Sequence, residues 1–177
     1  MMKNKTKNTA ICGLMTALSV VLMMLTTLIP VFMYVIPIIT GLLVLFVADV
    51  TDKKWGAGVY FSTAFLSLLL ITDKEAALTY SLFFGYYPLI KDLLEKLPRF
   101  ISWILKLLIF NLAAVSIGVI SFYVFGVSGD EYNEFGKFTI PILLIMANVA
   151  FILYDFCLTK NRFLLIKLSH KLKKMIK

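Results

Sequence analysis

The sequence predicts an all-α integral membrane protein, and three observations predict it together: composition, the length of its apolar stretches and the distribution of charge. Of its 177 residues, 60% are hydrophobic and 16% are charged, and the mean hydropathy is +0.91. A soluble domain is about 45–50% apolar and about 25% charged. This chain has too few polar residues to cover a water-exposed surface. We therefore expect a bundle of six transmembrane helices in residues 1–158, followed by a basic amphipathic helix in 159–177.

Six apolar stretches approach or exceed the ~20 residues that a helix needs to cross the hydrocarbon core of a bilayer. They are Thr9–Ile29, Val31–Val50, Trp55–Thr72, Ala76 into the charged end 91–96, Phe100 to about Phe125, and Phe138–Leu158. We expect the first stretch to be a retained helix, because it is longer than the apolar core of a signal peptide and no cleavage motif follows it.

Prolines and short polar turns mark the ends of these stretches. Pro30 ends the first, and Thr51–Lys54 and Asp73–Glu75 separate the next ones. Pro37 lies near the start of the second stretch, where a loop or a bent turn is expected because proline kinks a helix interior. The longest connection is Gly126–Lys137. Such short turns predict antiparallel neighbours.

The positive charges predict the orientation. With six spans, fifteen Lys and Arg residues fall on the side of the two termini, and only Lys74 and Lys137 fall on the other side, together with five acidic residues. Lys and Arg are enriched in cytoplasmic loops. We therefore expect a multi-pass protein of the cell membrane with both termini in the cytoplasm.

The tail adds a second basic feature. Leu165, Leu168 and Leu172 recur at helical spacing, and lysines occupy another side of the same helix. This pattern is typical of a helix that lies on anionic lipids. We expect anionic lipids, and no nucleic acid, as the partner of the tail.

Residues that could support catalysis are scarce. The only histidine is His170 in the tail, and phosphate-binding, zinc-protease and serine-hydrolase motifs are missing from the sequence. We therefore expect no enzyme, no cofactor and no metal site.

Most charged residues of the stretches have a structural interpretation. Lys91 pairs by spacing with Glu95, and Asp92 with Lys96, at the cytoplasmic interface. Asp155 also lies near a cytoplasmic helix end. Lys106 lies inside the fifth stretch, and we expect its long side chain to extend to the cytoplasmic surface.

The fourth stretch carries the most distinctive pattern. Tyr80 precedes the string Phe83–Pro88, in which Pro88 leaves the carbonyl near Phe84 without its helical partner and should bend the helix. Gly85 permits close approach of another group. This aromatic, kinked helix could form the wall of a small-molecule pocket, or it could be a packed kink.

Asn111 and Asn148 lie near the middle of the fifth and sixth stretches. An amide at that depth needs hydrogen-bond partners. Either the two helices bond to each other through these residues, or the amides contact a small ligand.

The first stretch carries a face of small residues, Ala10, Gly13 and Ala17. Such a face lets another helix approach closely, either within this chain or from another protein.

Together, the length, the six helices, the cytoplasmic termini and the small-residue face resemble the substrate-binding S subunits of energy-coupling factor (ECF) vitamin transporters. The resemblance implies that Ala10, Gly13 and Ala17 dock on a shared coupling transmembrane subunit, although Gly13 departs from the usual alanine. It also implies a vitamin-like ligand in the outer half of the bundle. The residues that would line this site are Tyr34, Tyr80, Phe84, Tyr87 and Asn148.

Two functions therefore follow as expectations. The first is a substrate-capture subunit of an ATP-driven importer, whose ATPase subunits must come from partners because this sequence has no ATP-binding motif. The alternative is a non-transporting membrane scaffold for cell-envelope or cell-shape processes, in which the small face and the tail recruit partners.

Overall fold

The computed structural model describes residues 2–29, 32–125 and 139–175, and every element in these residues is helical. The all-α prediction is thus confirmed. The elements are α1 (Met2–Leu28), α2 (Val35–Val50), α3 (Lys53–Leu70), α4 (Lys74–Thr79), the π-helix η2 (Tyr80–Phe84), α5 (Tyr87–Leu94), α6 (Arg99–Phe125) and α7 (Thr139–Met175). The predicted connection Gly126–Lys137 lies outside the described residues.

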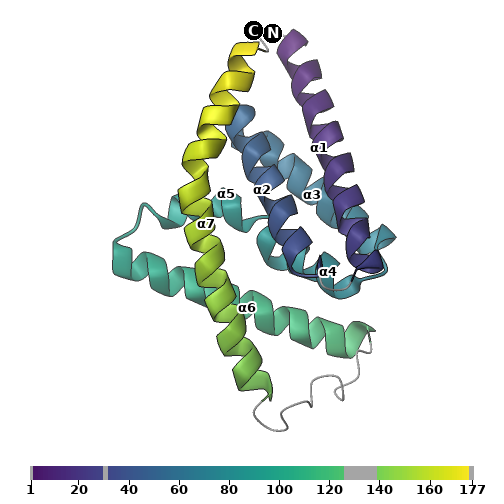
Figure 1. Ribbon diagram of the computed structural model, residues 1–177, viewed down its shortest axis with the longest axis vertical. Coiled ribbons are helices and arrows are strands. Elements are labelled where there is room, and N and C mark those ends of the chain that lie inside the picture. The colour runs from purple at the N-terminus through teal and green to yellow at the C-terminus, as the bar shows by residue number, and fades with distance from the viewer. Residues whose placement is uncertain (1, 30–31, 126–138, 176–177) are drawn as a thin grey trace.

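The helices pack in two groups that share α2. Helices α1, α2 and α3 contact one another, while α6 contacts the segment from α4 to α5, and α7 contacts α2 and α6 (Figure 1). The first core contains Met23, Val44 and Val59, and the second is built around Phe83, Phe110 and Phe151. The start of α1 and the end of α7 lie at the same end of the molecule in Figure 1.

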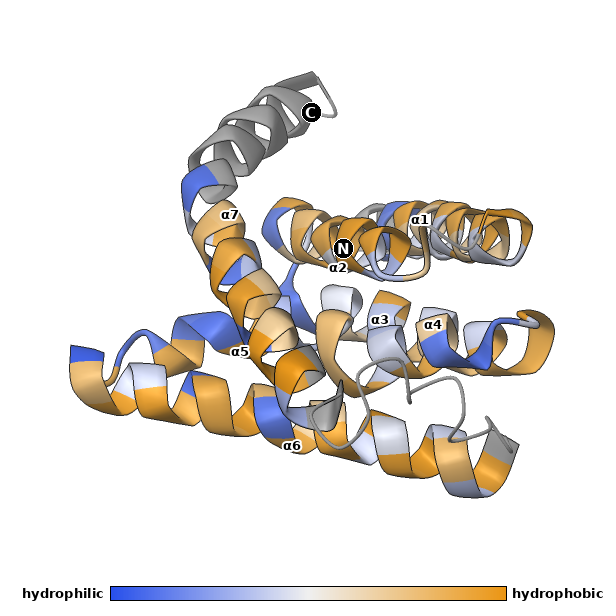
Figure 2. Ribbon diagram, turned by 60° about the horizontal axis from the view of Figure 1, so that its bottom comes forward, coloured by the Kyte–Doolittle hydropathy of each residue, from blue (hydrophilic) through white to orange (hydrophobic). Residues whose placement is uncertain are grey.

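Two helices are long and apolar enough to cross a membrane: α1 over Lys5–Leu28 and α6 over Arg99–Val124. Only 22% and 17% of the residues in their most apolar windows are buried. The core helix of a soluble protein would be mostly buried, so these low fractions favour two candidate membrane spans over two core helices. Figure 2 shows that hydrophobic residues, drawn in orange, predominate along α6.

The prolines act at helix starts. Helix α2 begins at Val35, so Pro37 lies in its first turn, where its missing N–H costs no helical hydrogen bond. Pro88 likewise lies in the first turn of α5. The bend predicted for the fourth stretch is therefore a break between η2 and α5.

Helix α7 continues without interruption from the sixth apolar stretch into the tail, through Leu158 and Thr159. The predicted amphipathic pattern of the tail lies on residues whose side chains are outside the described set.

Candidate functional site

The break in the fourth stretch brings α5 against α6 and α7. Asp73 begins the stretch by accepting a hydrogen bond from the Ala76 backbone N–H at 3.1 Å. The chain then widens into η2, where the Gly85 N–H donates to the Tyr80 carbonyl at 2.8 Å. The Phe84 carbonyl packs against Gly41 of α2, at a position where any side chain would collide with it. Gly41 thus allows α2 to approach the break.

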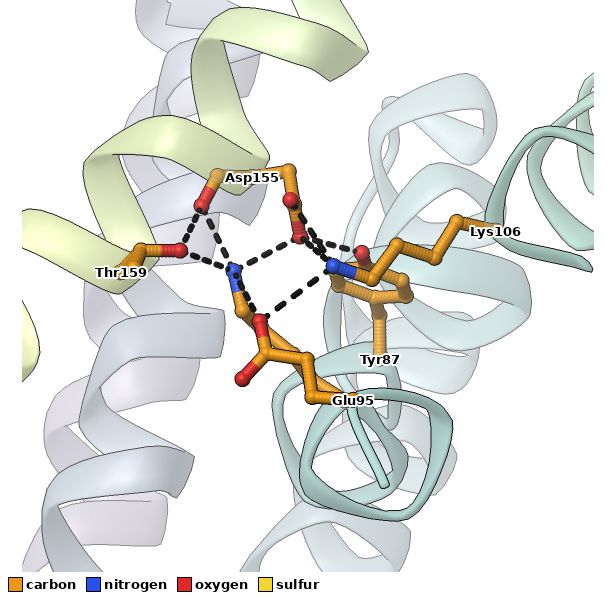
Figure 3. Close-up of polar contacts among 6 residues, drawn as sticks. Tyr87, Glu95, Lys106, Asp155 and Thr159 are labelled. Carbon is orange, nitrogen blue, oxygen red and sulfur yellow. Dashed lines mark hydrogen bonds and ion pairs between the residues drawn. The ribbon is translucent and has the colours of Figure 1, made fainter. Parts of the chain in front are cut away.

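The centre of the site is the carboxylate of Asp155 on α7, a residue that is only 4% exposed. Its Oδ1 accepts a hydrogen bond from the Tyr87 hydroxyl at 2.5 Å and one from Lys91 Nζ at 2.7 Å. Its Oδ2 accepts from Lys106 Nζ at 3.0 Å. Figure 3 shows these side chains converging from three helices. Asp155 therefore joins α5, α6 and α7 at one point.

The two lysines are as buried as the aspartate, with 4% exposed each. Lys91 Nζ also donates to the Asp155 backbone carbonyl at 2.6 Å and to the Thr159 hydroxyl at 2.8 Å. Lys106 Nζ also donates to Glu95 Oε1 at 3.3 Å, and it lies 5.5 Å from the centre of the Trp103 ring. Each ammonium group thus has several acceptors in place of water.

We call Tyr87, Lys91, Glu95, Lys106, Asp155 and Thr159 the charged cluster. Its two ammonium groups carry as much charge as its two carboxylates. Each lysine is within 4 Å of both Asp155 and Glu95, including Lys91 Nζ at 3.5 Å from Glu95 Oε1. Taking an ion out of water costs several kcal/mol, and only a partner of opposite charge with well-placed hydrogen bonds offsets it. The cluster is therefore a neutral unit that holds three helices together, provided that every member is present.

The sequence pointed to these charges but not to their arrangement. The predicted pair of Lys91 and Glu95 forms, at 3.5 Å. Asp92, in contrast, pairs with Lys53 of α3 at 2.8 Å, a partner that was not predicted. The expectation that Lys106 reaches the surface is wrong, because Asp155 neutralises it in the interior. The sequence did contain a signal for this pair, because Lys106 and Asp155 are opposite charges inside the fifth and sixth apolar stretches, where an unpaired charge would be costly.

Three of the five residues predicted to line a ligand site lie in the core. Tyr80 and Tyr87 are fully buried, and Phe84 is almost so. Phe83 stacks on Tyr87 with 4.8 Å between ring centroids, and Phe84 meets Tyr154 edge-on at 4.9 Å. The aromatic string packs against α6 and α7, and the Tyr87 hydroxyl belongs to the charged cluster.

Asn148 and Asn111 form a reciprocal pair. Each amide nitrogen donates to the oxygen of the other amide at 2.9 Å, and each also donates to a backbone carbonyl one turn earlier in its own helix. Of the two predicted roles, the structure provides the helix–helix bond between α6 and α7.

The remaining predicted residues lie at the surface. Tyr34, just before α2, is 58% exposed. Ala10, Gly13 and Ala17 share an exposed face of α1. A side chain added at Gly13 would meet nothing within 4 Å. This face is thus open rather than packed within the described part of the chain.

Two of the cavities among the described residues bear on the candidate site. One of about 220 Å³ lies between the ends of α1 and α3, next to Leu28 and Ile71. The other, of about 650 Å³, lies between the start of α6 and α7 and borders the charged cluster. Neither is lined by any of the five residues predicted to bind a ligand.

Metal-binding side chains do not gather in the described part of the chain: it has no group of three or more His, Cys, Asp or Glu residues that could hold a metal ion. Comparison with known proteins found no matching family model, curated protein or solved structure.

Proposed function

We propose that this protein is a multi-pass membrane protein with both termini in the cytoplasm that captures a vitamin-like small molecule for an ATP-driven, ECF-type importer. Six helical segments coincide with the six apolar stretches, counting α4, η2 and α5 as one broken span. The start of α1 and the end of α7 at one end of the molecule agree with this topology (Figure 1). The coupling subunit and the ATPases would be separate chains.

The observation that carries the proposal is the open small-residue face of α1. Ala10, Gly13 and Ala17 are exposed, although small residues on membrane helices typically serve close packing between helices. A partner helix docked there would bury this face. That is the contact expected between a capture subunit and its coupling subunit.

A non-transporting scaffold is the second candidate, and a different observation favours it. Tyr87 and Asn148 use their polar groups within the chain, and neither cavity reaches them. A scaffold would use the same open face of α1 to recruit partners without binding a ligand.

Native mass spectrometry of the tagged protein, purified from its own cells in a mild detergent, tests the proposal. We expect co-purified ATPase and coupling subunits, and we expect Gly13→Leu to lose them while its melting temperature stays unchanged. Gly118→Leu is the matched control, because Gly118 is equally open but lies on α6. Partners without ATPase subunits would favour the scaffold. Loss of folded protein in Gly13→Leu alone would show that the face packs within the chain.

A further inference from the structure

The cavity of about 650 Å³ combines charged and apolar walls. Arg99, Ser102 and Lys106 of α6 line one side, and Glu95 and Asp155 also border it. Leu97, Trp103 and Phe156 supply apolar walls. Such a mixture suits an amphiphile better than a fully polar solute.

Arg99, Ser102 and Lys106 follow one another at spacings of three and four residues, so they share a face of α6. Lys106 is neutralised in the charged cluster. Arg99 forms no ion pair with any described residue. Ser102, a residue only 6% exposed, lines the cavity, and its hydroxyl has no hydrogen-bond partner within the described part of the chain. A cation and a hydroxyl donor thus remain for a ligand.

The charges around the cavity specify the ligand's charge. The lining holds two cations, Arg99 and Lys106, and two carboxylates, Glu95 and Asp155. Lys91, which lies outside the lining, also neutralises Asp155, so these five residues together carry one positive charge in excess. Arg99 is also the first residue of α6, and the N-terminus of so long a helix favours an anion. A phosphodiester has one negative charge and oxygens that can accept from both Arg99 and Ser102.

The apolar walls specify what the phosphate is attached to. Phe156 is 63% exposed, and Leu97 and Trp103 also remain substantially exposed beside the cavity. Tryptophan is enriched where a membrane helix meets the lipid headgroups. We propose that this cavity binds the phosphate headgroup of an anionic phospholipid, whose acyl chains lie along these apolar side chains. This site is separate from the lipid contact expected of the tail.

Tryptophan fluorescence provides the test, because Trp103 lines the cavity and Trp55 is the only other tryptophan. In a Trp55→Phe background, the protein is placed in phosphatidylcholine vesicles that contain brominated phosphatidylglycerol or brominated phosphatidylcholine. We expect phosphatidylglycerol to quench Trp103 with about tenfold preference, as one charge-assisted hydrogen bond can provide. Arg99→Gln should abolish the preference, and Ser102→Ala should reduce it.

Lys96→Gln is the matched control. It also removes one positive charge, and Lys96 lies three positions from Arg99 in the sequence but does not line the cavity. Equal losses in Lys96→Gln and Arg99→Gln would overturn the proposal in favour of diffuse attraction. Relief of quenching by excess inorganic phosphate would also overturn it, because the site would then take a free anion. If Trp55→Phe fails to fold, native mass spectrometry can measure the phosphatidylglycerol that wild type, Arg99→Gln and Lys96→Gln retain. The proposal expects a loss in Arg99→Gln alone, and equal retention by Arg99→Gln and wild type would overturn it.

Discussion

Two polar contacts connect α6 to α7: one is formed by charged groups and the other by neutral groups. Lys106 meets Asp155 as an ion pair at 3.0 Å, and Asn111 meets Asn148 as a pair of amides at 2.9 Å. The first also recruits Tyr87 and Lys91 from α5. The second is complete in itself, because each amide donates to and accepts from the other.

The difference lies in what remains when one member is lost. An isolated buried charge costs far more than an isolated buried amide, since its hydration is much stronger. Removing one amide leaves a neutral group that still bonds to its own helix. Removing Asp155 leaves two ammonium groups sharing only Glu95. Losing one charged member of the cluster should therefore be costly, whereas the amide pair is replaceable.

Asp155→Ala should have the largest effect. It leaves Lys91 and Lys106 with Glu95 as their one shared carboxylate among the described residues, and breaking a buried ion pair typically costs about 3–5 kcal/mol. We expect a loss of this size in the free energy of unfolding, measured by denaturant titration in mixed micelles. The double variant Asp155→Asn with Lys106→Gln restores the charge balance and should recover part of the loss. If Asp155→Ala is as stable as wild type, the cluster does not hold the helices together.

Tyr87→Phe should have an intermediate effect. It removes one hydrogen bond to the Asp155 carboxylate and keeps the ring that stacks on Phe83. Hydrogen bonds to charged groups contribute about 1.5–3 kcal/mol. We expect a loss in that range by the same titration. In the double variant with Asp155→Ala the Tyr87→Phe effect should vanish, and additive losses would contradict the assigned bond.

Asn111→Leu should have the smallest effect, about 1 kcal/mol, as found for hydrogen bonds between membrane helices. The sharper test is Asn111→Leu with Asn148→Leu, which replaces both partners by apolar side chains of similar size. Such a replacement is often nearly neutral, so the double variant should be at least as stable as the single one. A double variant much less stable than either single variant would show that the amides serve more than each other.

The helix positions could be predicted because their causes are local. Apolar stretches, polar turns and prolines are adjacent in the sequence, and the structure follows them to within a few residues at the start of α3, α4 and α6. The bend at Pro88 was predictable for the same reason, although the π-helix Tyr80–Phe84 was not. In the structure, η2 contacts Gly41 and Tyr60, which lie on other helices, and such contacts cannot be found from local sequence.

The site was less predictable because its bonds span long separations. Lys106 and Asp155 are 49 positions apart, and Lys91 and Asp155 are 64 apart. Spacing within one helix predicted the pair of Lys91 and Glu95. It offered no partner for Lys106, whose side chain was therefore expected to extend to the surface. The sequence singled out Tyr87 for a ligand site, and in the structure its hydroxyl donates to Asp155, a partner 68 positions away.

By itself, the sequence determined the all-helical class, the places where helices begin and break, and the small-residue face of α1, because hydropathy and proline chemistry act over a few residues. Only the tertiary structure decided that this face is exposed, which buried charges meet and that the two asparagines bond to each other. It also decided where a cavity remains that is lined by Ser102 and by Arg99, an arginine without an ion pair among the described residues. Those outcomes depend on how α5, α6 and α7 cross. A buried charge is stable only where a distant helix supplies its partner.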